Sequence, residues 1–377
     1  MVKLGIDRHD VLSSLFAGKR LGLITGSSGM SSDHRYTIDV LKESFDLRAL
    51  FGPEHGVRGV LGPGETVESK VDTLSGLPVY SLFGSGTRCP DKEILDTLDI
   101  VVFDLQDVGS RYFTYASSLF CLMQGCAEAG KKVVVLDRPN PLGGDLLEGN
   151  THDEKLLSFI GLTKTPIRHG LTIGELGLYY NGEYGLGCDY TVVPLDGWKR
   201  STYFDETGLP FIKASPNLPT FDSVVLYNGT CLFSGTNVSE GRGTTSPFSV
   251  VGAPYINPIT LSAEANRLGL PGVSFSPTMF MPNFSKYPGQ SLSGVQIHVE
   301  KPHEVRPVEL GVRLFCLIRD NYEEFAPLAA GQNGIYHVDR LSGSDELRTG
   351  KSADDILENW DRQAKAFRPI HDKYLLY

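Results

Sequence analysis

Glu54, His55 and Arg58 place a carboxylate, an imidazole and a guanidinium within five residues of one another. The apolar run at residues 47–51 comes just before them and predicts a buried strand. Gly52-Pro53 interrupts such a strand, so the three side chains are expected in the loop at its carboxyl end. A carboxyl group in such a loop, with no helix to cap, is a candidate for acid-base chemistry.

Two later apolar runs end in the same kind of polar cluster. Residues 100–103 lead into Asp104 and Asp107, and residues 132–136 lead into Asp137-Arg138. Continuous β-branched runs of this length are typical of parallel strands that are buried on both faces. Because ligands of such sheets bind beyond the carboxyl ends of the strands, we expect the three clusters to meet in one crevice.

The carboxylates, histidines and arginines of these loops suit two kinds of chemistry. Paired carboxyl groups beside arginines fit glycoside hydrolysis, in which one carboxyl protonates the leaving oxygen and another assists from the opposite side. The same residue types also fit a divalent metal site. The metal ligands would be Glu54, His55, Asp104 and Asp107.

Glu54 is the first candidate for the catalytic acid. Asp104, Asp107, Glu65 and Glu240 compete for the role of its partner carboxylate. Asp104 and Glu240 are favoured, because an arginine follows each of them closely and could hold it ionised. The candidates for contact with a substrate are His55, Arg58, Glu65, Asp107, Arg111, Asn140, His169, Asn217, Asn237 and Arg242.

Several polar residues also have a structural interpretation. Asp137 and Arg138 would form an ion pair at a strand end, and Asp104 would cap a turn. Asn140, which lies between two prolines, would fix a turn. Glu175 completes the pattern Thr-Ile-Gly-Glu of a capping box, so its carboxylate is expected to accept from the backbone at a helix start.

Strand and helix patterns alternate along the first part of the chain, which predicts an α/β fold with a mainly parallel sheet. The apolar residues 223–233 fit either a strand or a helix. After Pro254 the pattern changes to a smaller α+β unit, whose last helix is expected at residues 352–367 and closed by Pro369. We therefore expect two domains, residues 1–252 and residues 253–377.

Composition excludes several classes of protein. The 377 residues carry a net charge of −10 and no basic run longer than a pair, which argues against nucleic acid as a partner. No apolar stretch approaches the ~18 residues of a membrane span. The amino terminus lacks an apolar signal core, so the sequence as written predicts a cytoplasmic protein, or a secreted or periplasmic one if a leader was removed.

No CxxC pair, dinucleotide fingerprint, Walker A sequence, G-x-S-x-G elbow or H-E-x-x-H motif occurs, so we expect no cofactor.

Six motifs, in order and over nearly the whole chain, resemble the exo-β-N-acetylmuramidase family of bacterial glycoside hydrolases, long described only as a domain of unknown function. Two segments differ from the family pattern. Gly26-Ser27-Ser28-Gly29 stands where members often have Asn-x-Thr-Gly, and Ser234 stands where they often have Glu. The motifs lie at residues 52–59, 103–115, 136–144, 168–176, 215–217 and 235–244.

The resemblance implies a Rossmann-like catalytic domain, a smaller C-terminal auxiliary domain and no nicotinamide or metal. It also implies release of N-acetylmuramic acid from the non-reducing ends of peptidoglycan fragments, with muropeptides or disaccharides as substrates. The lactyl carboxylate of this sugar is expected to pair with Arg58 or Arg242, helped by Asn217 or Asn237. The alternatives are a metal-dependent hydrolase of another class and a muropeptide-binding protein without catalysis.

Overall fold

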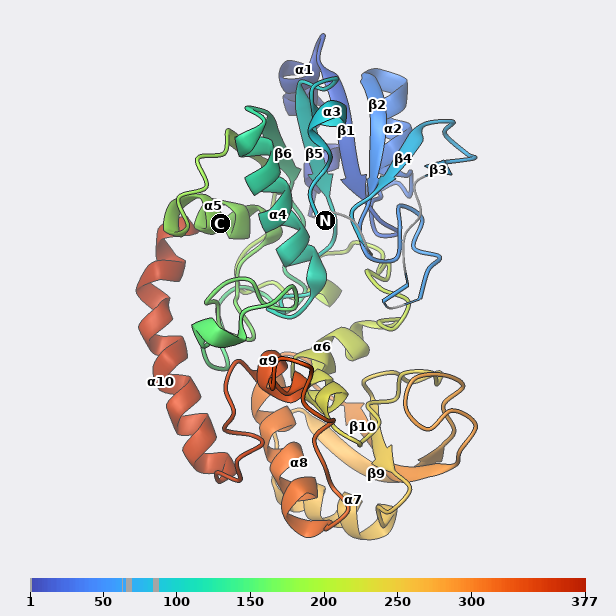
Figure 1. Cartoon of the computed structure of the whole chain (residues 1–377), viewed down its shortest axis with the longest axis vertical. Helices are drawn as coiled ribbons and strands as arrows, with labels where there is room; N and C mark the ends of the chain where they lie inside the picture. Colours follow the sequence, from blue (N-terminus) through green and yellow to red (C-terminus); the bar gives the residue numbers. More distant parts are fainter. Residues whose placement is uncertain (1, 63, 66–69, 84–87) are drawn as a thin grey trace.

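Parallel strands form the centre of the larger of two lobes. In the residues that this computed structural model describes, 2–62, 64–65, 70–83 and 88–377, seven strands pair in the order β3-β4-β2-β1-β5-β6-β7. Every neighbouring pair is parallel except β3 with β4. The predicted α/β fold with a mainly parallel sheet is confirmed (Figure 1). The strands are β1 (Arg20–Thr25), β2 (Asp46–Gly52), β3 (Lys70–Val71), β4 (Pro78–Ser81), β5 (Ile100–Asp104), β6 (Lys132–Leu136) and β7 (Tyr190–Val193).

Helices cover both faces of this sheet. Successive residues of a strand point to opposite sides, so each strand presents side chains to both layers of helices. Val101 of β5 belongs to the apolar cluster on one face, whereas its neighbour Val102 belongs to the cluster on the other. Both side chains are fully buried, which explains why the strand reads as an unbroken apolar run. The helices are α3 (Lys92–Leu95), α4 (Thr114–Glu128) and α5 (Ile173–Glu183) on the first face, and α1 (His9–Phe16) and α2 (Thr37–Ser44) on the second.

A three-stranded antiparallel sheet, in the order β8-β10-β9, forms the smaller lobe. The expected division after residue 252 falls inside β8, which pairs with β10. The smaller sheet therefore includes residues from both sides of that division. The elements of this lobe are β8 (Val250–Ala253), α7 (Pro258–Arg267), β9 (Val273–Phe280), β10 (Leu292–Val299), α8 (Pro307–Asn321) and α9 (His337–Ser342).

Helix α6 (Phe221–Thr230) lies between the two lobes (Figure 1). It and the 3-10 turn Cys231–Gly235 settle the ambiguity of residues 223–233, which are helical. The helix crosses α8 closely at Gly229. A Cβ atom on Gly229 would lie 2.0 Å from the carbonyl oxygen of Pro307, so only glycine permits this approach.

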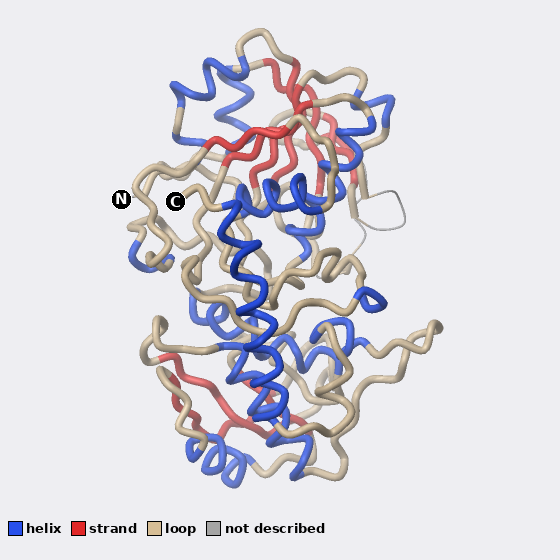
Figure 2. The backbone as a smooth tube through the Cα atoms, turned by 90° about the vertical axis from the view of Figure 1, so that its left-hand side faces the viewer, coloured by secondary structure: helices blue, strands red, loops and turns tan. Residues whose placement is uncertain are grey.

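Helix α10 (Ala353–His371) runs along both lobes on one side of the molecule (Figures 1 and 2). Ser352 caps its start by accepting a hydrogen bond from the Asp355 amide at 3.1 Å. The prediction that Pro369 closes this helix is wrong, because α10 continues through Pro369 to His371. Within the described part of the chain, no helix is long and apolar enough to cross a membrane.

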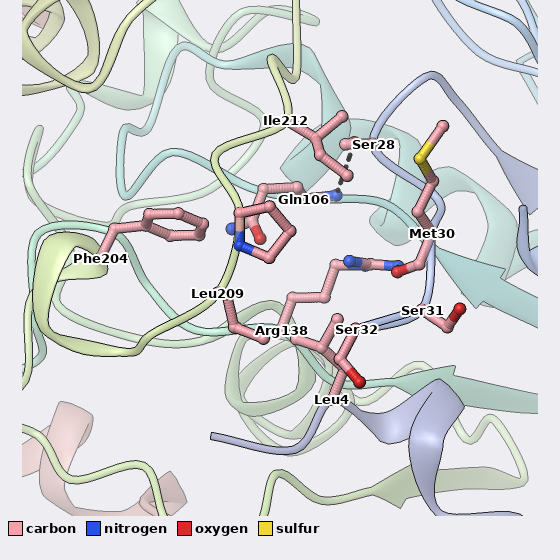
Figure 3. Close-up of a pocket in the computed structure, with 11 residues that line it drawn as sticks. Leu4, Ser28, Met30, Ser31, Ser32, Gln106, Arg138, Phe204, Leu209 and Ile212 are labelled. Carbon is pink, nitrogen blue, oxygen red and sulfur yellow. Dashed lines mark hydrogen bonds between the residues drawn. The ribbon is translucent and has the colours of Figure 1, made fainter. Parts of the chain in front are cut away.

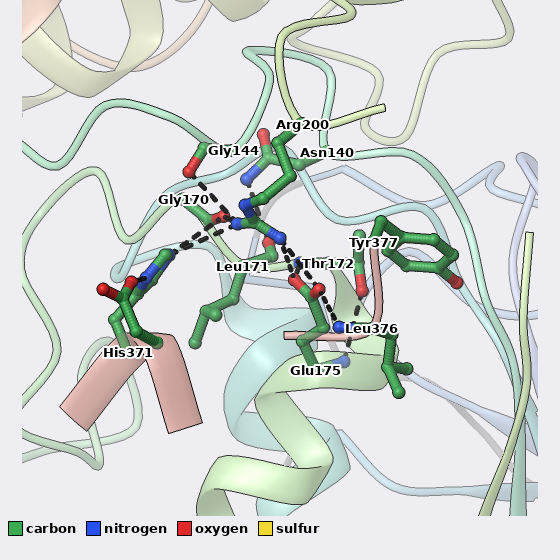
Figure 4. A network of polar contacts seen from close by, with 12 residues as sticks. Asn140, Gly144, Gly170, Leu171, Thr172, Glu175, Arg200, His371, Leu376 and Tyr377 are labelled. Carbon is green, nitrogen blue, oxygen red and sulfur yellow. Dashed lines mark hydrogen bonds and ion pairs between the residues drawn. The ribbon is translucent and has the colours of Figure 1, made fainter. Parts of the chain in front are cut away.

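The residues after α10 bind back onto the larger lobe (Figure 4). The Leu376 amide donates to Glu175 Oε1 at 2.8 Å, and the Tyr377 hydroxyl donates to Asp137 Oδ2 at 2.6 Å. Arg200 Nη1 donates to Glu175 at 2.8 Å, and Glu175 also completes the predicted capping box of α5. The tail is thus fixed by buried carboxylates of the larger lobe.

Candidate active site

The usual nucleotide crevice of this fold is filled by the chain's own side chains. In doubly wound sheets that crevice lies where the strand order reverses, here between β1 and β5. Arg138 Nε lies 2.6 Å from Asp104 Oδ1 and Arg138 Nη2 lies 2.9 Å from Oδ2. Thr37, at the start of α2, donates to the same carboxylate. The space that remains beside Arg138 is about 20 Å³, enough for about one water molecule (Figure 3).

Asp104 therefore has a structural environment. Its side chain is fully buried, and it links the ends of β5 and β6 to the start of α2. The expected pair of Asp137 with Arg138 is wrong, since Arg138 binds Asp104 instead. Asp137 accepts from the hydroxyls of Thr172 and Tyr377, and burial raises its pKa to about 6. The catalytic role of Asp104 stays a prediction, although Asp104 does not line the large cavity described below.

A cavity of about 500 Å³ lies between the two lobes. This volume is in the range of small-ligand pockets. Its lining joins the loop after β2, the start of α4 and the Ser215–Leu218 segment to parts of the smaller lobe. The polar side chains of the lining are Glu54, His55, Tyr112, Thr114, Ser215, Asn217, Tyr227, Ser234, Arg242, Ser285 and His337.

Glu54 is the single carboxylate of this lining among the described residues. Its Oε2 accepts from the Thr114 hydroxyl at 2.7 Å, and its Oε1 accepts from the Gly64 amide at 3.1 Å. The loop turns at His55 and Gly56, both of which have φ of 73°. His55 is buried, and its Nδ1 lies 3.0 Å from the Leu61 carbonyl oxygen, which closes the loop. Glu54 is thus held in one orientation from both sides.

Arg242 brings a positive charge to the same cavity from the smaller lobe. Its Nε lies 3.6 Å from Glu240 Oε1, and its guanidinium carbon lies 5.1 Å from the ring centre of Phe248. Burial lowers the pKa of Arg242, but Glu240 and weaker contributions from neighbouring acidic groups together outweigh this and raise it above the usual value. No group among the described residues accepts a hydrogen bond from Arg242. Its Nε is buried and faces Glu240, whereas the side chain as a whole keeps 27% of its surface exposed and available to a ligand in the cavity.

Glu240 lies behind Arg242 and is closed off from the cavity. Its side chain is 2% exposed; Oε1 accepts from the Ser234 hydroxyl at 2.9 Å and Oε2 from Lys286 Nζ at 2.8 Å. Burial raises the pKa of Glu240, but the charges of Lys286 and Arg242 outweigh this and hold it below the usual value. Glu240 is thus a buried anion that orients Arg242.

Four other candidates lie in a buried layer outside the cavity lining. Asp107 Oδ2 lies 3.3 Å from His169 Nε2 and accepts from the Gly109 amide at 2.7 Å. Asn140 fixes a turn, as its structural interpretation predicts, by accepting from Leu142 and donating to Leu171.

Arg111 donates to backbone carbonyls, among them Asn150 at 2.6 Å and Ser342 at 2.9 Å, and at 3.5 Å to the side-chain oxygen of Asn150. Burial lowers the pKa of its guanidinium to about 9. Because Asn150 lies in the larger lobe and Ser342 ends α9, Arg111 ties the two lobes together beside the cavity. Its position fits a structural role better than contact with a substrate.

The remaining candidates have other partners or lie in solvent. Arg58 forms a two-point pair with Asp72, at 3.1 and 2.7 Å, and does not line the cavity. Asn237 donates to the Glu324 carbonyl at 2.7 Å and accepts from the Tyr255 hydroxyl at 2.8 Å. Glu65 is exposed. Of the two arginines and two asparagines expected at the lactyl group, Arg242 and Asn217 are the ones that line the cavity.

The four metal ligands considered from the sequence are not gathered in one place. Glu54 and His55 line the cavity, whereas Asp104 binds Arg138 and Asp107 faces His169. Among the described residues, no cluster of three or more His, Cys, Asp or Glu is arranged to hold a metal ion.

Sequence reasoning missed several residues of the lining. Thr114 lies in a quoted motif, and its place three residues after Arg111 could have suggested it. His337 and Phe284 lie outside every motif, and the fold alone brings them to the cavity. Burial lowers the pKa of His337, and the Arg242 charge lowers it further, which favours a neutral imidazole there.

Comparisons with known proteins agree over nearly the full length of the chain. Residues 21–222 match the N-terminal part and residues 225–377 the C-terminal part of the exo-β-N-acetylmuramidase NamZ family. The peptidoglycan β-N-acetylmuramidase NamZ of Bacillus subtilis (strain 168) is 42% identical over 367 residues, which cover 96% of this chain and 87% of that protein.

Two solved structures of DUF1343 family proteins from Bacteroides fragilis NCTC 9343 have the same fold. One is 36% identical with a TM-score of 0.89, and the other is 32% identical with a TM-score of 0.79. Each alignment covers 100% of this chain and 99% of the other. Family match, identity and fold agree, and the chain belongs to the exo-β-N-acetylmuramidase NamZ family of glycoside hydrolases.

Proposed function

We propose that this protein is an exo-acting glycoside hydrolase that releases N-acetylmuramic acid from the non-reducing ends of peptidoglycan fragments. The observation that carries the proposal is the position of Glu54, a fixed carboxyl group in a cavity of about 500 Å³ that is also lined by Arg242. The named activity of the Bacillus subtilis relative supports the same substrate class.

Glu54 acts as the general acid in this proposal. Cleavage of a glycosidic bond leaves an alkoxide unless a proton reaches the leaving oxygen, and a positioned carboxyl group supplies it. Thr114 can donate to the ionised form of Glu54 and can accept from the protonated form, because a hydroxyl group does both. The same contact therefore holds Glu54 before and after the proton is transferred.

Arg242 recognises the feature that distinguishes muramic acid from N-acetylglucosamine. That feature is a lactyl ether, which adds a carboxylate to the sugar. A guanidinium binds a carboxylate through two parallel hydrogen bonds, and the donors of Arg242 have no acceptor among the described residues. Glu240, which is itself fixed by Lys286, holds Arg242 in place from behind without contact with the sugar.

The second participant in the reaction is the substrate's own acetamido group. In the cavity lining that the structure describes, Glu54 has no partner carboxylate. The acetamido oxygen attacks the anomeric carbon while Glu54 protonates the leaving oxygen, and the bond to the leaving group breaks. Water then opens the cyclic intermediate and gives its proton to the Glu54 carboxylate. This route fits the known exceptions to the two-carboxylate mechanism.

Turnover of a chromogenic β-glycoside of N-acetylmuramic acid tests the function. We expect release of the chromophore by the wild-type protein, also after treatment with a chelator. No release, with binding of the sugar retained, would support a muropeptide-binding protein instead. Loss of release after chelation, restored by a divalent metal, would support the metal-dependent hydrolase.

A further inference from the structure

Phe284 is an apolar side chain that lines the cavity and yet keeps 48% of its surface exposed. It lies in the segment 281–291 between β9 and β10, and the cavity that it lines is also lined by Glu54 of the larger lobe. A residue that both lines a cavity and remains half exposed must lie at the mouth. An aromatic ring in that position leaves apolar surface in water unless a ligand covers it.

The segment around Phe284 is held firmly by polar contacts. The Asn283 amide donates to the Gly243 carbonyl at 2.8 Å, and a Cβ atom on Gly243 would lie 2.4 Å from the Phe284 oxygen. Lys286 Nζ donates to Phe233 O and Val238 O, both at 2.6 Å, and to Glu240 at 2.8 Å.

Backbone geometry adds to this rigidity. Ser285 and Tyr287 have φ of 73° and 54°, and the Tyr287 hydroxyl donates to the Asn237 carbonyl at 2.7 Å. Non-glycine residues adopt positive φ only where surrounding contacts impose it. The fold thus keeps the Phe284 ring at the cavity mouth at a cost in strain and exposure, which a binding role explains.

The orientation of the bound glycan decides which of its sugars contacts the Phe284 ring. An exo-acting enzyme takes the terminal sugar into its cavity, and the rest of the glycan leaves through the mouth. The leaving sugar begins at the oxygen that Glu54 protonates, so it lies on the solvent side of Glu54. A β-linked N-acetylhexosamine has equatorial substituents and axial C–H groups, and these C–H groups pack against the flat face of an aromatic ring.

We propose that the ring of Phe284 is the platform on which the leaving sugar packs, so that Phe284 sets a preference for glycan leaving groups over small ones. The inference rests on the proposed function, because it assumes that the terminal muramic acid fills the cavity. It goes beyond that function by assigning the adjoining subsite and its chemistry.

The test compares two substrates that differ only in the leaving group. One is the disaccharide of N-acetylmuramic acid and N-acetylglucosamine, and the other is the methyl β-glycoside of N-acetylmuramic acid. Both leaving groups are alcohols, so both need the proton from Glu54. We expect Phe284→Ala to lower kcat/KM for the disaccharide by about three- to tenfold, the usual range for one aromatic contact, and to leave the methyl glycoside unchanged. Phe284→Trp should keep the preference.

Met279→Ala is the matched control. Met279 is 70% exposed and close to Phe284 in sequence, but it does not line the cavity, so its loss should change neither substrate. Equal losses on both substrates for Phe284→Ala, or no loss on either, would overturn the inference. A loss confined to substrates that carry a stem peptide would also overturn it, because the ring would then bind peptide. Wild-type protein that cleaves neither glycoside would overturn the proposed function itself, an outcome distinct from all of these.

Discussion

Replacing Arg242 should change which sugar the enzyme accepts. In the wild-type protein, the guanidinium is positioned by the Glu240 carboxylate 3.6 Å away, and its other donors remain free for the lactyl carboxylate. A charge-assisted hydrogen bond contributes about 1.5–3 kcal/mol, so Arg242→Ala should lower kcat/KM for a muramic acid glycoside by about ten- to 150-fold. Arg242→Lys should lose a large part of this, because an ammonium cannot form the two parallel bonds.

The assay is the ratio of kcat/KM for two glycosides with the same leaving group, one of N-acetylmuramic acid and one of N-acetylglucosamine. The ratio matters because loss of Arg242 also removes a partner of Glu240, and that damage affects both substrates equally. Arg58→Ala is the control: Arg58 binds Asp72 outside the cavity lining, so the ratio should stay constant even if the protein becomes less stable. An unchanged ratio in Arg242→Ala and Arg242→Lys would refute recognition of the lactyl group by Arg242.

Three further predictions concern the carboxyl groups of Glu54, Asp104 and Asp137. Glu54→Gln should lower kcat by about two to four orders of magnitude with an unchanged melting temperature, and near wild-type turnover would remove Glu54 from the acid role. Asp104→Asn leaves Arg138 without its buried counter-charge, so urea unfolding should show a loss of about 3–5 kcal/mol in the free energy of unfolding, and the kcat of the folded protein decides whether Asp104 also has the predicted catalytic role. For Asp137, the native pKa of about 6 lies above the reference value of 3.8, so the native state binds more protons than the unfolded state between these pH values. The free energy of unfolding should therefore fall by roughly 2 kcal/mol as pH rises from 4 to 6, and Asp137→Asn should abolish this dependence; equal pH profiles for the two proteins would contradict it.

The local part of the fold could be predicted from the sequence because its causes are local. The strand before Glu54 ends at a Gly-Pro pair, and the capping box at Glu175 is complete within four residues. Residues 223–233 could not be assigned, because a helix buried between two lobes has no polar face to reveal its period. Only the packing against α8 at Gly229 shows which alternative is correct.

The site was harder to predict, because the residues that contact one another there come from distant parts of the chain. Glu54 and Asp104 carry the same sequence signal, a carboxylate after a buried strand, yet one lines the cavity and the other binds Arg138. Arg58 and Arg242 also looked alike, and a single contact with Asp72 separates them. Sequence supplies the types of residue at strand ends, but it does not show which charges neutralise one another inside the fold.

The contacts at the chain's end have a thermodynamic consequence for ligand binding. Helix α10 contacts α8 of the smaller lobe and is secured to the larger lobe through Leu376 and Tyr377. Detachment of this helix would weaken the connection between the lobe that carries Glu54 and the lobe that carries Arg242. A sugar that contacts both residues stabilises the arrangement in which the tail is bound to the larger lobe. By thermodynamic reciprocity, the bound tail increases the affinity of the cavity for the sugar. The Leu376 amide, bound to Glu175, should therefore exchange its hydrogen with solvent more slowly when the cavity is occupied.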